Sequence, residues 1–417
     1  MIPEKPQPRQ LPSWIDSFLS YTDGTPAPEI FRKWAAISAV AGALERRTWL
    51  QTSAAGMLYP NMFLLLVAPP GIGKDQALMP MRDLWASTGL FNLAPISMTN
   101  KGLLDELADA HTQKTIMDVK TNTWLNYHSL LLSVPELGVL IPEHDLSFMS
   151  ILNELFNCND IFDERIRTKG ERLRIERPHL HLIAGTQPKY MGALFPEAAY
   201  GMGFTARIIM IYAGEPVRVS LFTRRPERRD LRLALISDLK SIGRLQGPFN
   251  LAQETMDAIE RWHLHDSDIN KPTHSKLIHY SARRTMHLLK LSMIFSVSRS
   301  NDLIISLEDW HHAQAALFEV EATMPEIFKE ISSGGQIAEM EEAFHFIMRL
   351  FLAKKKAVPE RLLFHFLSNR VPANQINWLV DTMLRSGMIK EVAHPDRLNI
   401  PGRERFFEPL GFNKVED

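Results

Sequence analysis

Cysteine is nearly absent from this sequence. The 417 residues include a single one, Cys158. One cysteine cannot form an internal disulfide or a zinc site built from cysteine ligands, so both are excluded. Such scarcity is typical of proteins that work in a reducing compartment, and we expect a cytoplasmic location.

A strong net charge and long hydrophobic runs are also missing. Lysine and arginine total 47 against 48 acidic residues, a formal charge of -1, so any site for a polyanion must be a local patch. The longest apolar runs, around residues 63–68 and 130–134, are too short to span a bilayer. Residues 1–12 are polar and proline-rich, unlike a signal peptide. We therefore expect a soluble protein with no membrane partner.

What remains is the composition of an ordinary globular protein with several domains. Hydrophobic residues make up 45% and charged residues 23% of the chain, and its length suggests about two to four domains. Strand and helix patterns alternate in the first half, which indicates an α/β fold with a mainly parallel sheet. Helical patterns follow, and the chain closes with three helices and a β-hairpin, typical of a winged helix. The predicted parts are an N-terminal helical segment (1–47), an α/β core (48–215), a linker (216–248), a helical domain (249–332) and a winged-helix domain (333–417) with a break near Gly334.

A glycine-rich loop follows the apolar run 63–68. Its Gly71, Gly73 and Lys74 correspond to the end of the pattern that cradles nucleotide phosphates, where backbone N–H groups and a lysine meet phosphate oxygens. Ala68 replaces the usual first glycine, and Asp75 replaces the hydroxyl that binds Mg²⁺. The loop predicts an ATP site formed by residues 71–76, in which Ile72 and Gln76 complete the binding segment.

A catalytic acid is expected at the end of a neighbouring strand. Glu136 follows the run 130–134 and stands where a general base belongs, but Pro135 occupies the place of a metal-holding aspartate. We infer that Asp75 could supply the missing carboxylate to Mg²⁺, which prefers oxygen ligands. The opposing interpretation is that the substitutions at 75 and 135 mark a weakened or inactive site.

Further polar residues suit a role around the phosphates. Thr186 and Gln187 end the strand expected beside the phosphate loop and could orient water or contact the γ-phosphate. Arg207 precedes another strand and could reach the nucleotide of a neighbouring subunit. Arg283, in the first turn of a helix, is poorly placed for the helix dipole and could be held by an anion such as ATP phosphate.

One segment has the character of a nucleic-acid contact. Residues 165–177 alternate basic and apolar residues around Lys169-Gly170, which predicts a β-hairpin with one cationic face. Such a face would bind a phosphate backbone without reading sequence, although cations also protect sheet edges. Arg405 adds a cation in the predicted wing, whereas the recognition helix 373–386 is poor in positive charge. The predicted contacts of the hairpin are Arg165, Arg167, Lys169, Arg172 and Arg174.

The order of these motifs resembles the AAA+ ATPases of the replicative-helicase branch. The chain is similar, over roughly residues 48–410, to phage and mobile-element helicase-like proteins of the primase-associated group and more distantly to minichromosome-maintenance helicases. The resemblance implies a P-loop ATPase core, a helical lid and a C-terminal winged helix. It also implies that Lys74 binds phosphate, Glu136 is the base, Thr186 and Gln187 form the first sensor, Arg207 is a trans-acting arginine finger and Arg283 is the second sensor.

The implied function is an ATP-dependent DNA helicase or translocase in phage or mobile-element replication. It would need ATP and Mg²⁺, assemble as a ring that is expected to be hexameric, and draw single-stranded DNA past the 165–177 hairpins in the host cytoplasm. A separate primase or polymerase would be its partner, because no primase domain precedes the ATPase part. Two alternatives remain open: a helicase loader or replication initiator, and a non-hydrolysing DNA-binding scaffold.

Overall fold

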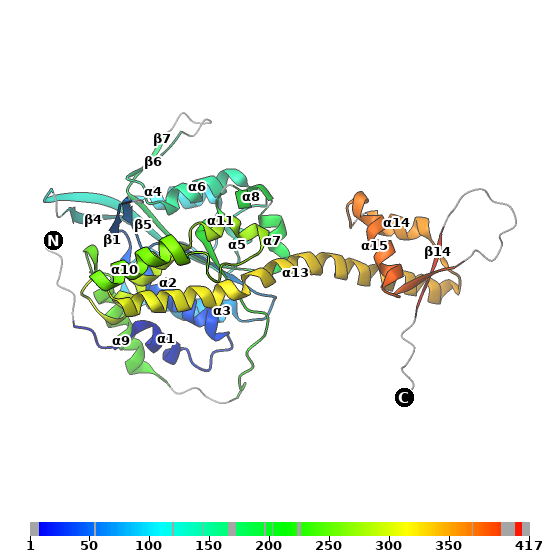
Figure 1. Cartoon of the computed structure of the whole chain (residues 1–417), viewed down its shortest axis with the longest axis horizontal. Coiled ribbons are helices and arrows are strands. Elements are labelled where there is room, and N and C mark those ends of the chain that lie inside the picture. Colours follow the sequence, from blue (N-terminus) through cyan, green and yellow to red (C-terminus); the bar gives the residue numbers. More distant parts are fainter. Residues whose placement is uncertain are drawn as a thin grey trace. The chain divides into compact units, whose positions relative to one another are not determined.

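The computed structural model of the chain describes residues 8–53, 56–118, 121–143, 145–165, 172–195, 197–201, 203–222, 227–368, 370–392 and 405–410 (Figure 1). The chain divides into two compact units, residues 1–328 and 329–417. The first is a mixed α/β unit, which agrees with the predicted class, and the second is smaller.

A five-stranded sheet forms the centre of the first unit. Its strand order is β4-β5-β8-β3-β9, and all neighbours run parallel except β4 and β5. The register aligns Val67 with Thr186 and with Tyr212, and Val134 with Ala184, so the carboxyl ends of four strands meet at one edge. We call this the carboxyl edge, and the opposite edge, where β3 and β9 begin, the amino edge. The strands are β3 (Phe63–Val67), β4 (Gln113–Asp118), β5 (Thr123–Val134), β8 (Pro178–Thr186) and β9 (Ile208–Tyr212).

The central strands are apolar because helices cover both faces of the sheet. Every residue of β3 and β8 is buried. The predicted adjacency of the β8 segment to the strand of the phosphate loop is confirmed, since β3 pairs with β8 along its whole length. Figure 1 shows α2 (Glu29–Leu44) and α6 (Leu146–Phe156) on opposite sides of the sheet, and both pack against β8.

Two histidines occupy buried positions in β8. Burial lowers the pKa of His179 to about 3 and the pKa of His181 well below its usual value, so both rings are neutral. The Met62 N–H donates to Nδ1 of His181, and the proton on Nε2 is therefore available to Ser38 Oγ at 2.8 Å. His179 pairs with Ser129 Oγ at 3.0 Å. These bonds satisfy polar groups inside the core and fix β8 against α2 and β5.

Helix α2 lies at the middle of the helical layer. All but three of its residues are buried, and it packs against four other helices. This degree of burial explains its almost continuous apolar and small side chains. The helices around it are α1 (Trp14–Tyr21), α3 (Lys74–Thr88), α9 (Arg229–Ile242) and α12 (Arg284–Arg299).

A second sheet joins the start of the chain to a much later part. Its order is β11-β10-β1-β2, with β1 (Thr48–Thr52) parallel to β10 (Gly247–Leu251), and β10 parallel to β11 (Ile304–Ile305). The fourth strand, β2 (Gly56–Leu58), is antiparallel to β1. Residues 249–328 therefore belong to the same compact unit as the α/β core, and the expectation of a separate helical domain is wrong for this part of the chain.

The predicted linker 216–248 also needs correction. Its second half contains α9, whose inner face is buried, followed by the start of β10. Charged residues at the beginning of this range gave the impression of a solvated linker, but Leu235, Leu239 and Ile242 are fully buried on α9. A helix exposed on one face keeps many polar residues, which hides its role from a composition argument.

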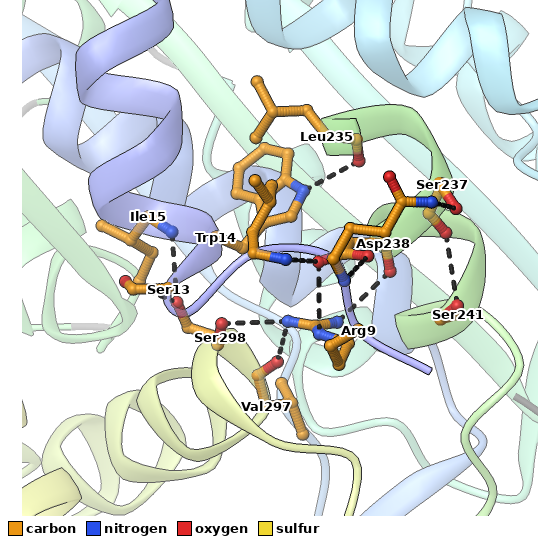
Figure 2. A network of polar contacts seen from close by, with 12 residues as sticks. Arg9, Ser13, Trp14, Ile15, Leu235, Ser237, Asp238, Ser241, Val297 and Ser298 are labelled. Atoms are coloured by element: carbon orange, nitrogen blue, oxygen red, sulfur yellow. Dashed lines mark hydrogen bonds and ion pairs between the residues drawn. The ribbon is translucent and has the colours of Figure 1, made fainter. Parts of the chain in front are cut away.

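The segment before α1 is held by a polar network (Figure 2). Asp238, fully buried on α9, accepts hydrogen bonds from the backbone N–H groups of Gln10 and Leu11 and lies 3.6 Å from Arg9 Nε. The Arg9 guanidinium also donates to the carbonyls of Val297 and Ser298 on α12. These bonds connect the N-terminal segment with α9 and α12 at once.

Shorter elements complete the first unit. The predicted hairpin is present but begins earlier, with β6 (Ile161–Arg165) antiparallel to β7 (Arg172–Glu176). Figure 1 shows this pair extending outward beside α4 and α6, and β7 packs against α4. The remaining helices are α4 (Asn100–Ala108), α5 (Leu137–Leu140), α7 (Pro188–Leu194), α8 (Glu197–Gly201), α10 (Gln253–Arg261) and α11 (Ile278–Ser281), with one-turn segments η1 (Ala110–Thr112), η2 (Thr205–Arg207), η3 (Trp262–Asp266) and η4 (Ser275–Leu277).

The second unit has a core of its own. The expected helix break near Gly334 is absent, because α13 runs continuously from Leu307 to Lys354 and contains the boundary between the units. Glycine costs about 1 kcal/mol in a helix, which a helix of 48 residues tolerates. Ala343 and Ile347 of α13 pack with the other elements around Phe407. These are α14 (Glu360–Ser368), α15 (Ala373–Arg385), and a sheet in the order β12 (Val358–Pro359), β14 (Phe406–Pro409), β13 (Ile389–Val392).

Candidate functional site

The glycine-rich loop lies between β3 and α3, as its sequence predicts. Gly71 and Gly73 have φ values of 82° and 88°, in the left-handed region that favours glycine. Gly73 is the N-cap of α3 and makes no side-chain cap, so the first N–H groups of this 15-residue helix point toward the loop without a capping side chain. Such a helix terminus carries a partial positive charge and suits an anionic group.

Gly73 is also required by a close approach from the N-terminal part of the chain. A Cβ atom at this position would lie 2.1 Å from the backbone oxygen of Pro26 and 3.0 Å from Cα of Ala27. No side chain can be accommodated at this distance. The loop is therefore supported from behind by the segment that joins α1 to α2.

Lys74 lies above the loop. Its Nζ donates to the carbonyl of Ala68 at 2.9 Å and is 3.4 Å from that of Pro69. Partial burial lowers the pKa of Lys74, while the carboxylates of Glu136 and Asp75 oppose this shift. The ammonium is thus held by carbonyl groups that it can exchange for phosphate oxygens.

Glu136 lies two residues beyond the end of β5 and is close enough to Lys74 for their charges to interact. Burial raises the pKa of its carboxyl group, and nearby Thr186, Lys74 and Gln187 partly oppose the shift, whereas the charge of Asp75 adds to it. Glu136 Oε1 and Thr186 Oγ1 are both buried, and neither makes a hydrogen bond of good geometry with a described residue, although the Thr186 hydroxyl lies close enough to lower the pKa of the Glu136 carboxyl group. Buried polar atoms are normally paired, so a carboxylate and a hydroxyl that lie close together with poor mutual geometry suit a site that accepts an additional hydrogen-bonding group.

Gly185 explains how these groups come so close together. A Cβ atom there would lie 2.2 Å from the Pro135 carbonyl and 3.4 Å from Cδ of Lys74. The ends of β5 and β8 therefore touch beside the lysine, and only glycine permits this contact. We call the group of polar residues gathered here the phosphate-loop cluster: Lys74, Asp75, Glu136, Thr186 and Gln187.

The two other predicted loop residues have different positions. Ile72 is 5% exposed and points into the protein, so its contribution to a ligand would come from its backbone. Gln76 is exposed on the first turn of α3, as is Asp75. No group of three or more His, Cys, Asp or Glu residues able to hold a metal occurs among the described residues. A Mg²⁺ ion would thus bind to Asp75 together with phosphate and water oxygens, which is its usual preference beside nucleotides.

Arg207 and Arg283 form a second group. Arg207 is 9% exposed in η2, donates to the Gly203 carbonyl at 2.8 Å, and its Nε is buried without a partner. Burial and the neighbouring charge of Arg283 lower the pKa of Arg207 to about 10. Burial also lowers the pKa of Arg283, whose guanidinium donates to Met286 Sδ at 3.8 Å. Neither arginine pairs with a carboxylate in the described part of the chain.

The two arginines are far from the phosphate-loop cluster. Arg207 precedes Ile208, which is aligned with Phe63 at the amino edge, whereas the loop leaves β3 at Val67. The four steps from Phe63 to Val67 in a parallel strand span about 13 Å, and the loop lies beyond them. The structure therefore groups Arg283 with Arg207 and not with Lys74.

Two neighbours of this pair were not foreseen from the sequence. Lys290 is fully buried, its Nζ donates to the backbone and side-chain oxygens of Asn61, and it lies 4.0 Å from the centre of the Phe156 ring. Burial, with added repulsion from Arg283 and Arg207, lowers the pKa of Lys290 to about 7. His287 has a pKa lowered to about 3 by burial, and its Nε2 is 3.0 Å from the Ala206 carbonyl. Their helical spacing resembles that of ordinary core positions, so no sequence signal marked them.

The described part of the hairpin carries charges of both signs, and the predicted cationic face is only partly visible in it. Arg174 is exposed and lies opposite Asp163, and Glu176 lies two residues farther along the same face. Phe162 and Ile175 are buried on the other side. Arg167 and Lys169 fall outside the described residues, as do the side chains of Arg165 and Arg172.

Arg405 in the second unit is also committed to protein contacts. It forms ion pairs with Glu360 at 2.6 Å and Asp381 at 3.3 Å. Its charge is therefore largely neutralised, and the expectation of a free cation in the wing is wrong at this position.

Neither the family models nor the curated proteins that were searched contain a match to this chain. Among the helices of the described residues, none combines the length and apolar character needed to cross a membrane. The interpretation of the site therefore depends on its geometry.

Proposed function

We propose that this protein is an ATP-dependent DNA motor of the AAA+ type, a helicase or translocase that works as a ring-shaped homo-oligomer. One observation carries the proposal: the phosphate-loop cluster lies at the carboxyl edge, and an arginine pair without carboxylate partners among the described residues lies at the amino edge of the same sheet. The cluster would bind an anion and could use further cations, whereas the arginine pair has cations and no anion within the described residues. A neighbouring copy that presents its amino edge to the phosphate loop would complete the site.

The residues of the cluster suit nucleotide binding and hydrolysis. The N-terminus of α3 and Lys74 would hold the phosphates, and Asp75 would contribute an oxygen to Mg²⁺, which neutralises charge that develops on the transferred phosphoryl group. Glu136, whose partly buried carboxyl group has a raised pKa, would accept the proton of the attacking water. Thr186 and Gln187 are placed to orient that water or the γ-phosphate.

Arg207 and Arg283 would act on the nucleotide bound by the adjacent subunit. Removing arginines from water without pairing them costs free energy, and a phosphate group supplied in trans would offset that cost. Both would then be parts of one composite site. This arrangement also explains why two positive side chains are kept next to each other.

The DNA-directed part of the proposal depends on the β6–β7 hairpin and the resemblance to replicative helicases. Arg174 is an exposed cation on this hairpin. Because Asp163 and Glu176 share its face, we expect weaker backbone binding from the described strands than a purely basic face would give. A winged-helix role for the second unit remains part of the proposal, with a protein partner favoured by the neutralised Arg405.

Mixing two inactive variants tests the composite site. Lys74→Ala and Arg207→Ala should each lose ATP hydrolysis, but an equal mixture should recover part of it, since some interfaces then combine an intact loop with an intact arginine. ATP turnover would be measured with and without single-stranded DNA, with Lys101→Ala as a control for an exposed lysine. Failure of the mixture to exceed the single variants would contradict the trans arrangement.

A nucleotide-dependent assembly factor, such as a helicase loader, is the second candidate. It is favoured by Pro135, which stands where a metal-holding carboxylate is expected. Such a protein would bind ATP and oligomerise on DNA but would not displace a strand. A strand-displacement assay with a forked duplex distinguishes it from the motor.

A further inference from the structure

The arginine pair at the amino edge lies against the first turn of α12. Arg207 belongs to η2, in which the carbonyl of Ala206 is 3.0 Å from Nε2 of His287 on α12. Arg283 is the N-cap of the same helix. After burial, the charge of Arg283 is the second cause that lowers the pKa of Arg207, so the two guanidinium groups are close enough to repel each other. Segments distant in the sequence thus bring two cations to one place.

This place is electrostatically suited to an anion. Helix α12 has 16 residues, and no side chain caps its N-terminus, where a helix carries a partial positive charge. Arg283 at the N-cap is repelled by this charge unless an anion lies nearby. Arg207 is only 9% exposed, and its Nε is buried without a hydrogen-bond partner among the described residues. Three positive groups therefore meet here, and the most deeply buried side chain keeps an unused donor.

Lys290 adds a positive charge next to the pair. Its Nζ is 4.0 Å from the centre of the Phe156 ring, and Cζ of Arg207 is 6.0 Å from the same centre. The Nζ group already donates to the backbone and side-chain oxygens of Asn61, so its charge, and not a free donor, acts on the pair. An anion bound at the arginines would be attracted by this charge as well.

We propose that Arg207, Arg283 and the N-terminus of α12 bind a free tetrahedral oxyanion such as inorganic phosphate, within a single chain and without nucleotide. Arginine donates paired N–H groups to such an anion, and the backbone N–H groups of a helix terminus add further donors. The site goes beyond the proposed function, in which the same arginines meet the nucleotide of another subunit. One consequence rests on that function: phosphate released by hydrolysis would compete with the neighbour's nucleotide for the pair.

Calorimetric titration with sodium phosphate tests the site. The full-length, nucleotide-free protein would be used at a dilution at which sedimentation velocity shows a monomer, with sodium chloride keeping the ionic strength constant. The phosphate loop can also bind phosphate, so the titration is made with Lys74→Ala protein. We expect one saturable site per chain. Adding Arg283→Ala should lower its affinity at least about tenfold, as expected for the loss of hydrogen bonds to a charged group.

An exposed arginine elsewhere provides the matched control. Arg261 on α10 is exposed, so Arg261→Ala removes the same charge and should leave the phosphate affinity unchanged. Arg283 is only half-buried, so Arg283→Ala should fold even if Arg207→Ala does not. Equal losses in the Arg261 and Arg283 variants, or no phosphate binding by Lys74→Ala protein, would overturn the site.

A proton-linked measurement tests where the anion binds. Burial lowers the pKa of Lys290 to about 7, with added repulsion from Arg283 and Arg207, and the thiol of Cys158 opposes the shift. An anion bound at the pair raises this pKa, so the protein takes up protons at pH 7.5. Sulfate, which does not titrate in this range, would be used as the probe in buffers of different ionisation enthalpy.

Lys290→Met separates binding from proton uptake. In the Lys74→Ala background this variant should still bind sulfate but take up no proton, because methionine does not titrate. The exposed Lys101→Met serves as the control and should keep the uptake. Sulfate binding without proton uptake in Lys74→Ala protein, or with the same uptake in the Lys290 variant, would place the anion elsewhere and overturn the inference.

The site and the proposed function can fail separately. Phosphate binding by the Lys74→Ala monomer, together with no ATP turnover by the wild-type protein, would keep the site and reject the motor. ATP turnover that returns when Lys74→Ala and Arg207→Ala are mixed, together with no phosphate binding by the single chain, would keep the motor and reject the site.

Discussion

The two edges of the central sheet differ in how their cations are compensated. At the carboxyl edge, Lys74 lies near Glu136 and Asp75, which oppose the fall in its pKa. At the amino edge, burial lowers the pKa of Arg207, Arg283 and Lys290, the charge of Arg283 adds to the shift of Arg207, and both arginines add to the shift of Lys290. No carboxylate among the described residues pairs with any of the three. Under the proposed function, the first edge would bind a phosphate with its metal, and the second would receive an anion from outside the chain. The cations of one sheet can therefore be compensated by carboxylates at one end and, within the described residues, left without one at the other.

The largest effect should come from Glu136→Gln at the carboxyl edge. Amide replacement keeps the shape but removes the proton acceptor, so ATP turnover should fall by about 10²- to 10⁴-fold. Binding of a fluorescent ATP analogue should be retained, because the amide removes a negative charge near the phosphates. A variant that turns over ATP at the wild-type rate would exclude Glu136 as the base.

Asp75→Ala tests whether the metal ligand lies in the loop. If Asp75 holds Mg²⁺, the Mg²⁺ concentration for half-maximal turnover should rise at least about tenfold, which corresponds to about 1.4 kcal/mol. Gln76→Ala, the exposed neighbour, serves as the control. Unchanged or improved turnover in Asp75→Ala would show that the relocated carboxylate is not a ligand.

A pair of glycine variants separates backbone strain from the contact with Pro26. Gly71→Ala and Gly73→Ala both place a side chain at positive φ, which costs roughly 1–2 kcal/mol, but only the second meets the Pro26 oxygen. Gly73→Ala should therefore lower Tm and nucleotide affinity more than Gly71→Ala. If the two variants lower Tm in calorimetry and nucleotide affinity in titration by equal amounts, the contact between Gly73 and Pro26 does not contribute to stability or binding.

The smallest effect concerns the pH dependence of stability at the amino edge. The pKa of Lys290 is about 7 in the folded protein and higher when the chain is unfolded, so the unfolded state binds more protons above pH 7. The free energy of unfolding should then rise with pH above 7, by up to about 1.4 kcal/mol per pH unit. Below pH 7 the lysine is protonated in both states and adds no slope.

Lys290→Met should flatten this rise, since methionine does not titrate. Urea unfolding between pH 6.5 and pH 9.5 would measure the slope, with the exposed Lys101→Met as the control. The same slope in both variants would show that Lys290 titrates normally.

The carboxyl edge could be predicted from the sequence because its parts are local. The strand, loop and helix of residues 63–88 are contiguous, and the register of β3 and β8 places Thr186 beside Val67 as expected. Glu136 and Gln187 follow apolar runs, and this pattern can be recognised in the sequence alone. The amino edge is different, because Asn61, Arg207 and Lys290 are distant in sequence and meet only through tertiary packing.

Short or irregular elements escaped prediction for similar reasons. β11 has two residues, too few to show alternation, and β10 contains Gly247 and Pro248, which disfavour a strand, yet both complete the sheet that begins with β1. In the sequence Arg405 has the character of an exposed basic residue, but in the structure it forms ion pairs with Glu360 and Asp381. In each case a partner distant in the sequence determines whether the segment forms a strand or the charge is neutralised.

The parallel pairing of β1 with β10 has a consequence for synthesis of the protein. Thr48 meets Gly247, so β1 has no partner on this side until roughly 200 more residues have been translated, about 10–40 s at 5–20 residues per second. The face of α2 that packs against α12 stays exposed for longer still, because α12 comes later in the chain. Early in synthesis only α1, α3 and β3 are available to cover α2, so the faces that pack against α9 and α12 stay exposed while the ribosome makes most of the first unit. Transiently exposed apolar surface of this kind is prone to aggregation and is what chaperones bind.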